Sequence, residues 1–257
     1  MSKSKKIDLV ILLIYPILAV FISHLLKINF LGSLVVFLGV PSLYLTIKGW
    51  KFAKRASVFA LISIPLAIVL DYIGHLTGQW LLPFSMFSRI FEYVSVEMIF
   101  WSFINFYFIV MFYEYFVHQH FAGKLWYSKL KYLIISVLVV FILFLSFYNF
   151  LPSYLHIPYF YLGFTIVLVL IPILLQLFKY PRFISKFFET AAYFFYLTLL
   201  YEITALQLGW WSFPSEQFIG WVSIGNIRFP LEELIFWMIL CAMAVLSYYE
   251  YFDDREK

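Results

Sequence analysis

The chain has 257 residues, of which 64% are hydrophobic and only 12% are charged, so it cannot present an ordinary hydrated surface. Its net charge of +4 is spread over several loops, which excludes the dense basic patch typical of nucleic-acid binding. The single cysteine, Cys241, excludes a disulfide framework and a cysteine-based metal site. Together with a mean hydropathy of +0.93, these values predict an integral membrane protein.

The apolar runs, taken in chain order, predict eight membrane-spanning helices. Each run is close to the ~20 residues that a helix needs to cross the hydrocarbon core, where lipid offers no partner for exposed backbone groups. The predicted spans cover residues 8–26, 30–48, 57–76, 96–117, 131–150, 157–178, 186–208 and 231–250. The first run reaches Lys27 without a small-residue cleavage site, so we expect a span and not a signal peptide. The predicted fold is an all-α, polytopic membrane helical bundle.

The basic residues lie on alternate connections between these spans. Their four groups fall within residues 3–6, 48–55, 124–131 and 179–186. Loops rich in Lys and Arg stay on the cytoplasmic side, so both termini are predicted to be cytoplasmic and the protein to lie in the cell membrane. The basic loops would then face anionic lipid headgroups.

One acidic and aromatic motif occurs twice. Glu97-Met98-Ile99-Phe100-Trp101 returns as Glu233-Leu234-Ile235-Phe236-Trp237, 136 residues later. Before the motif the offset is 131, and it relates Gly32/Gly163, Pro41/Pro172, Asp71/Glu202, Gly78/Gly209, Trp80/Trp211, Pro83/Pro214 and Phe87/Phe218. The second half has therefore gained five residues between Phe218 and Glu233. This self-similarity predicts two tandem membrane repeats, which we place at residues 1–127 and 128–257.

Each predicted repeat holds four spans. An even number gives both repeats the same orientation, related by a pseudo-twofold axis along the membrane normal, whereas an odd number would invert one of them. The assignment of four depends on short turns at residues 27–29 and 151–153, which separate the first two spans of each repeat.

Five acidic residues lie at one end of the predicted bundle. Asp71 and Glu202 come late in spans three and seven, and Glu97, Glu232 and Glu233 begin spans four and eight. A carboxyl group inside a span is costly, so we interpret these five as candidate catalytic residues. The alternative for Glu232 and Glu233 is that they are only carboxylates favoured at the start of a helix.

Two more carboxylates, Glu114 and Glu250, follow Glu97 and Glu233 by seventeen residues each. At ~1.5 Å per residue they lie about 25 Å away, at the other end of the bundle, and cannot share a small site with the first five. The tyrosines around them favour an interfacial belt.

Aromatic side chains accompany the candidate acids. They share one helix face with the acid at i+3 and i+4: Phe236 and Trp237 beside Glu233, and Phe100 and Trp101 beside Glu97. An acid in such apolar surroundings has the means to keep its proton, and the faces of the rings stabilise a cation. We therefore interpret these four rings as candidate substrate-binding residues.

Trp80 and Trp211 precede turns beside the acids, and they are either anchors at the membrane interface or further walls of the same pocket. We expect spans three, four, seven and eight to surround one elongated pocket that opens sideways to lipid.

His75 lies one helical turn after Asp71 and has no counterpart in the second repeat, so we expect it to make a structural hydrogen bond to Asp71.

The order of these residues resembles the membrane-embedded lycopene cyclase family of archaea, fungi and some actinobacteria, in which the unit occurs twice. In the second repeat the match comprises Glu202, Gly209, Trp211, Pro214, Pro230, Leu231, Glu232, Glu233 and Phe236. In the first repeat it comprises Asp71, Gly78, Trp80, Pro83, Glu97 and Phe100. The first repeat departs from the pattern at Val94 and Val96, which leaves open whether both repeats are catalytic. The family unit is also often drawn with three spans, whereas we predict four.

The resemblance implies an acid-initiated isomerisation. An acid protonates the terminal double bond of a linear polyene, an internal double bond attacks the resulting cation, and a base removes a ring proton. It implies a lipophilic polyene substrate taken from the membrane lipids, with no cofactor and no metal. The sequence has no Gly-x-Gly-x-x-Gly motif and no spaced histidine clusters, which argues against a flavin or di-iron enzyme. The alternatives are a related isoprenoid hydratase, a transporter with two repeats, and a non-enzymatic membrane scaffold.

Overall fold

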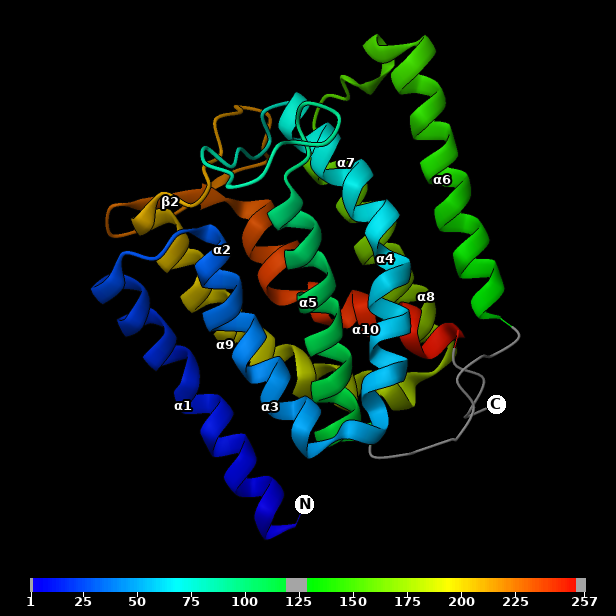
Figure 1. The fold of residues 1–257 in the computed structure, drawn as a ribbon. Helices are drawn as coiled ribbons and strands as arrows, with labels where there is room; N and C mark the ends of the chain where they lie inside the picture. Colours follow the sequence, from blue (N-terminus) through cyan, green and yellow to red (C-terminus); the bar gives the residue numbers. More distant parts are fainter. Residues whose placement is uncertain (1, 119–128, 253–257) are drawn as a thin grey trace.

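The computed structural model describes residues 2–118 and 129–252 and is built almost entirely of helices (Figure 1). The first half contains α1 (Lys3–Leu26), α2 (Phe30–Ser33), η1 (Leu34–Gly39), α3 (Val40–Lys48), α4 (Trp50–Leu76), α5 (Val96–Phe112) and η2 (Tyr113–His118). The second half contains α6 (Leu130–Phe150), η3 (Pro152–Leu155), α7 (Phe160–Thr165), η4 (Ile166–Leu170), α8 (Ile171–Lys179), η5 (Pro181–Phe183), α9 (Ile184–Leu208), β1 (Trp221–Ile224), β2 (Ile227–Pro230), η6 (Glu233–Ile239) and α10 (Cys241–Phe252). The predicted boundary between residues 127 and 128 lies outside the described residues.

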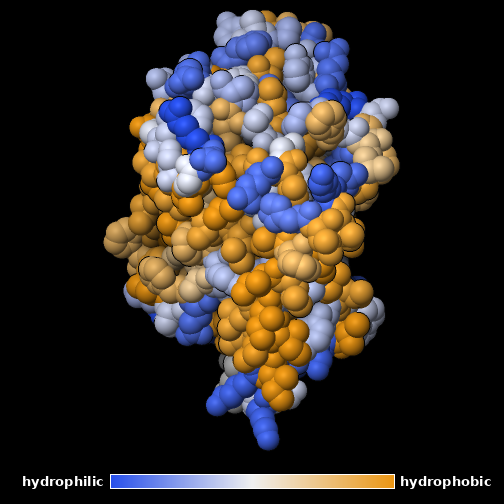
Figure 2. All heavy atoms as spheres, turned by 90° about the vertical axis from the view of Figure 1, so that its left-hand side faces the viewer, coloured by the Kyte–Doolittle hydropathy of each residue, from blue (hydrophilic) through white to orange (hydrophobic). Residues whose placement is uncertain are grey.

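Seven of the described helical stretches are long and apolar enough to cross a membrane. The pair η6–α10, bent by 48°, makes an eighth if it counts as one span. On the face seen in Figure 2, hydrophobic residues cover a wide area and hydrophilic residues gather mainly toward the two ends. The prediction of an all-α, polytopic bundle is confirmed, and the chain is an integral membrane protein. The third span begins at Trp50, earlier than the predicted residue 57.

A proline interrupts the second span of each half at the same place. Pro41 and Pro172 have no backbone N–H, and their rings clash with the preceding helical turn, so regular bonding cannot continue across them. The N–H of Val40 instead reaches back five residues to the carbonyl of Val35, and the residue before Pro172 does the same. The result is a π-helical turn just before each of these prolines, η1 and η4.

Repeat-related residues touch each other along the centre of the bundle. The rings of Trp101 and Trp237 have centroids 4.5 Å apart, and those of Tyr113 and Tyr249 have centroids 6.3 Å apart. Equivalent residues can meet at both ends of two helices only if the helices run in the same direction. The α5–η2 and η6–α10 segments are therefore parallel, and a pseudo-twofold axis passes between them.

The loops after α4 and α9 also pair across this axis. Leu81 and Ser212, which are 131 residues apart, exchange two backbone hydrogen bonds of 2.9 and 3.0 Å. These loops cover one end of the bundle, which we call the loop end. We call the opposite end, where the N-terminus lies, the basic end (Figure 1).

The five residues gained by the second half lengthen a short loop into the β-hairpin β1–β2, which the sequence did not predict. In the first half Ile90 pairs directly with Val94, whereas in the second half Trp221 pairs with Pro230 at the base of a longer ladder. The hairpin turns at Gly225, whose φ of 59° lies in the left-handed region that a two-residue turn requires.

Glu114 and Glu250 are buried between the halves at the basic end, so the prediction of an interfacial belt is wrong. Only 1% of Glu114 and 4% of Glu250 are exposed. The hydroxyl of Tyr249 donates a hydrogen bond to Glu114. The Nδ1 atom of His118 lies 3.6 Å from Glu114 and 3.8 Å from Glu250. Buried polar groups require polar partners. Here the partners come from both halves, so these contacts join the two repeats.

Candidate functional site

An apolar cavity of about 380 Å³ lies between the two halves, beneath the paired loops. Its described walls come from α4, α5, α6, α7–η4 and η6–α10, and from the loops after α4 and α9. This volume falls within the roughly 300–1,000 Å³ of small-molecule sites. Among the described lining residues none comes from α9, although it was expected to form a wall; α6 and α7–η4 take that place.

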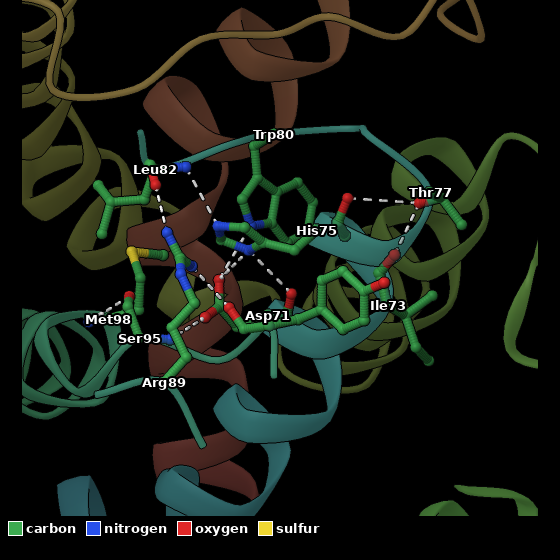
Figure 3. Close-up of polar contacts among 11 residues, drawn as sticks. Asp71, Ile73, His75, Thr77, Trp80, Leu82, Arg89, Ser95 and Met98 are labelled. Carbon is green, nitrogen blue, oxygen red and sulfur yellow. Dashed lines mark hydrogen bonds and ion pairs between the residues drawn. The ribbon is translucent and has the colours of Figure 1, made fainter. Parts of the chain in front are cut away.

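Asp71 lines the cavity, and its carboxylate has three polar neighbours (Figure 3). Trp80 Nε1 lies 3.0 Å from Oδ1, and the backbone N–H of Ser95 lies 3.2 Å from Oδ2. His75 Nδ1 lies 3.0 Å from Oδ1 and forms a hydrogen bond of 3.1 Å with the backbone carbonyl oxygen of Asp71. The Nε2 atom of His75 accepts the backbone N–H of Leu82, so this network places the ring proton on Nδ1, beside the backbone carbonyl and the carboxylate of Asp71. The expected bond between His75 and Asp71 is present.

The second repeat keeps one of these bonds and changes the rest. Trp211 Nε1 donates to Glu202 across 2.9 Å, as Trp80 does to Asp71. Glu202 is fully buried, and its carboxyl group lies against that of Glu233. Glu233 lines the cavity and accepts a hydrogen bond from the hydroxyl of Tyr161. Glu202 therefore has a second buried carboxyl group as its neighbour, whereas Asp71 has a histidine.

The two acidic groups lie on either side of one aromatic contact. The rings of Trp80 and Tyr161 meet edge to face with centroids 5.5 Å apart. Trp80 donates to Asp71, and Tyr161 donates to Glu233. All four residues line the cavity. The cavity thus holds two acidic groups in different surroundings.

The other two candidate acids bind the loops. Glu97 accepts hydrogen bonds from the hydroxyl of Ser85 and the backbone N–H of Met86. Glu232 accepts the backbone N–H of Ile219 at 2.7 Å. Both carboxyl groups are buried, and neither is among the described residues that line the cavity. Although Glu97 aligns with Glu233 in the repeat, its bonding resembles that of Glu232.

Five of the six candidate aromatic residues line the cavity: Trp80, Trp101, Trp211, Phe236 and Trp237. The exception is Phe100, which is 46% exposed and is not among the described lining residues. Its repeat partner Phe236 does line the cavity, because the cavity lies to one side of the pseudo-twofold axis.

Tyr161 was missed from the sequence, although one signal pointed to it. Its counterpart at the 131 offset is Phe30, so the second repeat carries a hydroxyl group where the first has none. A buried tyrosine hydroxyl needs a polar partner, and here that partner is Glu233. In residues 2–118 and 129–252 no group of three His, Cys, Asp or Glu side chains is placed to hold a metal ion.

Gly74 provides the space that Trp80 needs to reach Asp71. A Cβ atom at Gly74 would lie 2.1 Å from the Trp80 ring. We expect Gly74→Ala to displace this ring and to destabilise the protein by ~1–3 kcal/mol, as overpacking of a core does. Gly163→Ala is the control, because a Cβ atom there meets nothing within 4 Å. Equal thermal unfolding temperatures for the two variants in detergent would contradict the packing described.

No family model, curated protein or solved structure matches this chain.

Proposed function

We propose that the protein cyclises the end group of a linear, lycopene-type polyene by acid–base chemistry in the membrane. The observation that carries the proposal is the presence of two acidic groups, Asp71 and Glu233, with different partners in one apolar cavity. Pairs of titratable groups whose surroundings favour opposite protonation states are typical of acid–base catalysts. The motif resemblance to the membrane-embedded lycopene cyclases supports the same reaction.

Glu233 is the proposed acid. Its carboxyl group lies against that of Glu202, and two buried like charges repel strongly, so the pair favours one shared proton. Tyr161 orients the Glu233 carboxyl group toward the cavity through its hydrogen bond. The proton adds to the terminal double bond of the substrate and leaves a tertiary cation.

Asp71 is the proposed base. Trp80 and Ser95 donate N–H groups to its two carboxylate oxygens, and His75 Nδ1 lies 3.0 Å from one of them, an arrangement that suits the charged carboxylate. In the reaction, the electrons of an internal double bond form the new ring bond, and Asp71 removes a ring proton, which restores a double bond. The product is an isomer of the substrate, so no oxidant or reductant is used up.

The remaining walls suit a short-lived cation. Trp101 and Trp237 pack against each other, and both line the cavity with Phe236. Aromatic faces stabilise a positive charge, and apolar walls keep out the water that would capture it. This dryness favours cyclisation over hydration.

The substrate is proposed to reach the cavity from the lipid. Among the five described residues of η4 none is buried, and α6 is the least enclosed of the long spans. Both elements line the cavity, so a lipid-dissolved chain can approach between them.

We place both termini on the cytoplasmic side of the cell membrane, and reporter fusions at the N-terminus and after Lys51 should both report the cytoplasm.

Expression in a lycopene-producing bacterial host tests the proposal. The wild-type chain should convert red lycopene into cyclic carotenoids that chromatography separates from it. A host that makes normal amounts of membrane-inserted protein and leaves lycopene unchanged would contradict the proposal and favour a scaffold.

A further inference from the structure

We propose that the chain holds one apolar substrate end at a time, and that Ser63 and Ala244 set how deep this end enters the cavity. The proposal rests on the proposed function. If it holds, a polyene with two reactive ends must leave the cavity and return for its second ring. The cavity lies to one side of the pseudo-twofold axis. Repeat-related residues therefore surround a corresponding region on the other side.

Aromatic rings fill that corresponding region. Three cavity-lining residues have a phenylalanine as their counterpart in the other repeat: Phe194 for Ser63, Phe37 for Leu168 and Phe108 for Ala244. These three rings are at most 2% exposed. The centroids of Phe108 and Phe194 are 5.0 Å apart, so the rings meet in the middle of the region.

The contact between Phe108 and Phe194 defines where their small counterparts lie. By the same symmetry, Ser63 and Ala244 stand on facing walls of the cavity, which both line. The Ser63 hydroxyl donates to the carbonyl of Ala60 at 2.7 Å, so its polarity is satisfied within its own helix. Small size is then what these two side chains contribute to the cavity. Among the described residues, the cavity is open on one side of the axis, and the corresponding region on the other side is packed with phenylalanine side chains.

Phenylalanine substitutions at the two positions test this assignment. Ser63→Phe and Ala244→Phe should fold, because the other repeat accepts phenylalanine at the equivalent places. Each should lower kcat/KM for lycopene by roughly 10²-fold, as misplacement of the reacting end by about 1 Å does. The matched controls are Leu61→Phe and Ile239→Phe, on the same segments but 54% and 38% exposed, and they should keep wild-type activity.

A binding measurement separates this inference from the cyclase proposal. Purified wild-type protein in lipid nanodiscs should retain one lycopene, or one squalene, per chain after washing, and both cavity variants should retain neither. Retention of two molecules per chain, or unchanged retention and kcat/KM in both variants, would overturn the inference. Failure of the wild-type protein to retain either probe would overturn it too. Retention of one molecule without conversion would leave the depth assignment standing and overturn the cyclase. Thermal unfolding close to that of the two controls shows that the variants are folded.

Discussion

Glu233→Gln should abolish nearly all turnover while leaving the protein folded. Glutamine is almost isosteric and can still accept the hydrogen bond from Tyr161, but it cannot deliver a proton to a double bond. Loss of a general acid lowers the rate by ~10²–10⁴-fold, or about 3–5 kcal/mol of barrier. The measurement is the rate of lycopene loss by purified protein in liposomes.

The neighbouring carboxyl group gives a matched control for this substitution. Glu232 accepts a backbone N–H from Ile219, and the amide oxygen of glutamine can accept the same bond. Glu232→Gln should therefore keep most of the activity. If Glu233→Gln and Glu232→Gln were equally active, or if Glu232→Gln were the inactive one, Glu233 would lose its role as the acid.

Asp71→Asn should lower turnover by a similar ~10²–10⁴-fold and change the products. An amide cannot remove the ring proton, and its NH2 group cannot replace a carboxylate oxygen facing the N–H groups of Trp80, His75 and Ser95. The cation then survives longer and is open to capture by water. Mass spectrometry should therefore find hydrated products rising relative to cyclic ones.

Asp71→Glu is the control, and the second repeat already supports it. Glu202 occupies the equivalent position and accepts a hydrogen bond from Trp211 at 2.9 Å, so the longer carboxylate fits this register. It should restore much of the activity lost in Asp71→Asn. Full activity of Asp71→Asn with unchanged products would assign the base to another group.

The helical fold and the repeat could be predicted from the sequence, because both depend on local signals. Long apolar runs fix the spans, and residues repeated in register, at offsets of 131 and then 136, predict the duplication. The hairpin β1–β2 could not be predicted beyond an insertion of five residues, since its strands are short and the turn at Gly225 alone is a weak signal.

The site could be predicted only in part, because residues at equivalent positions of the two repeats make different contacts. Glu97 and Glu233 align, yet Glu97 binds a loop and Glu233 faces the cavity. Which of two equivalent regions stays open depends on the volumes of facing side chains such as Phe108 and Phe194. Those contacts come from distant parts of the chain and cannot be read from spacing.

The most direct test of the central claim is the mass of the product made by purified protein from lycopene in liposomes without any added cofactor. We expect a monocyclic product and then a bicyclic product, both with the mass of lycopene, because protonation and deprotonation cancel. Products heavier by one water would identify a hydratase. Unchanged lycopene, with folded protein and bound substrate, would contradict catalysis by Glu233 and Asp71.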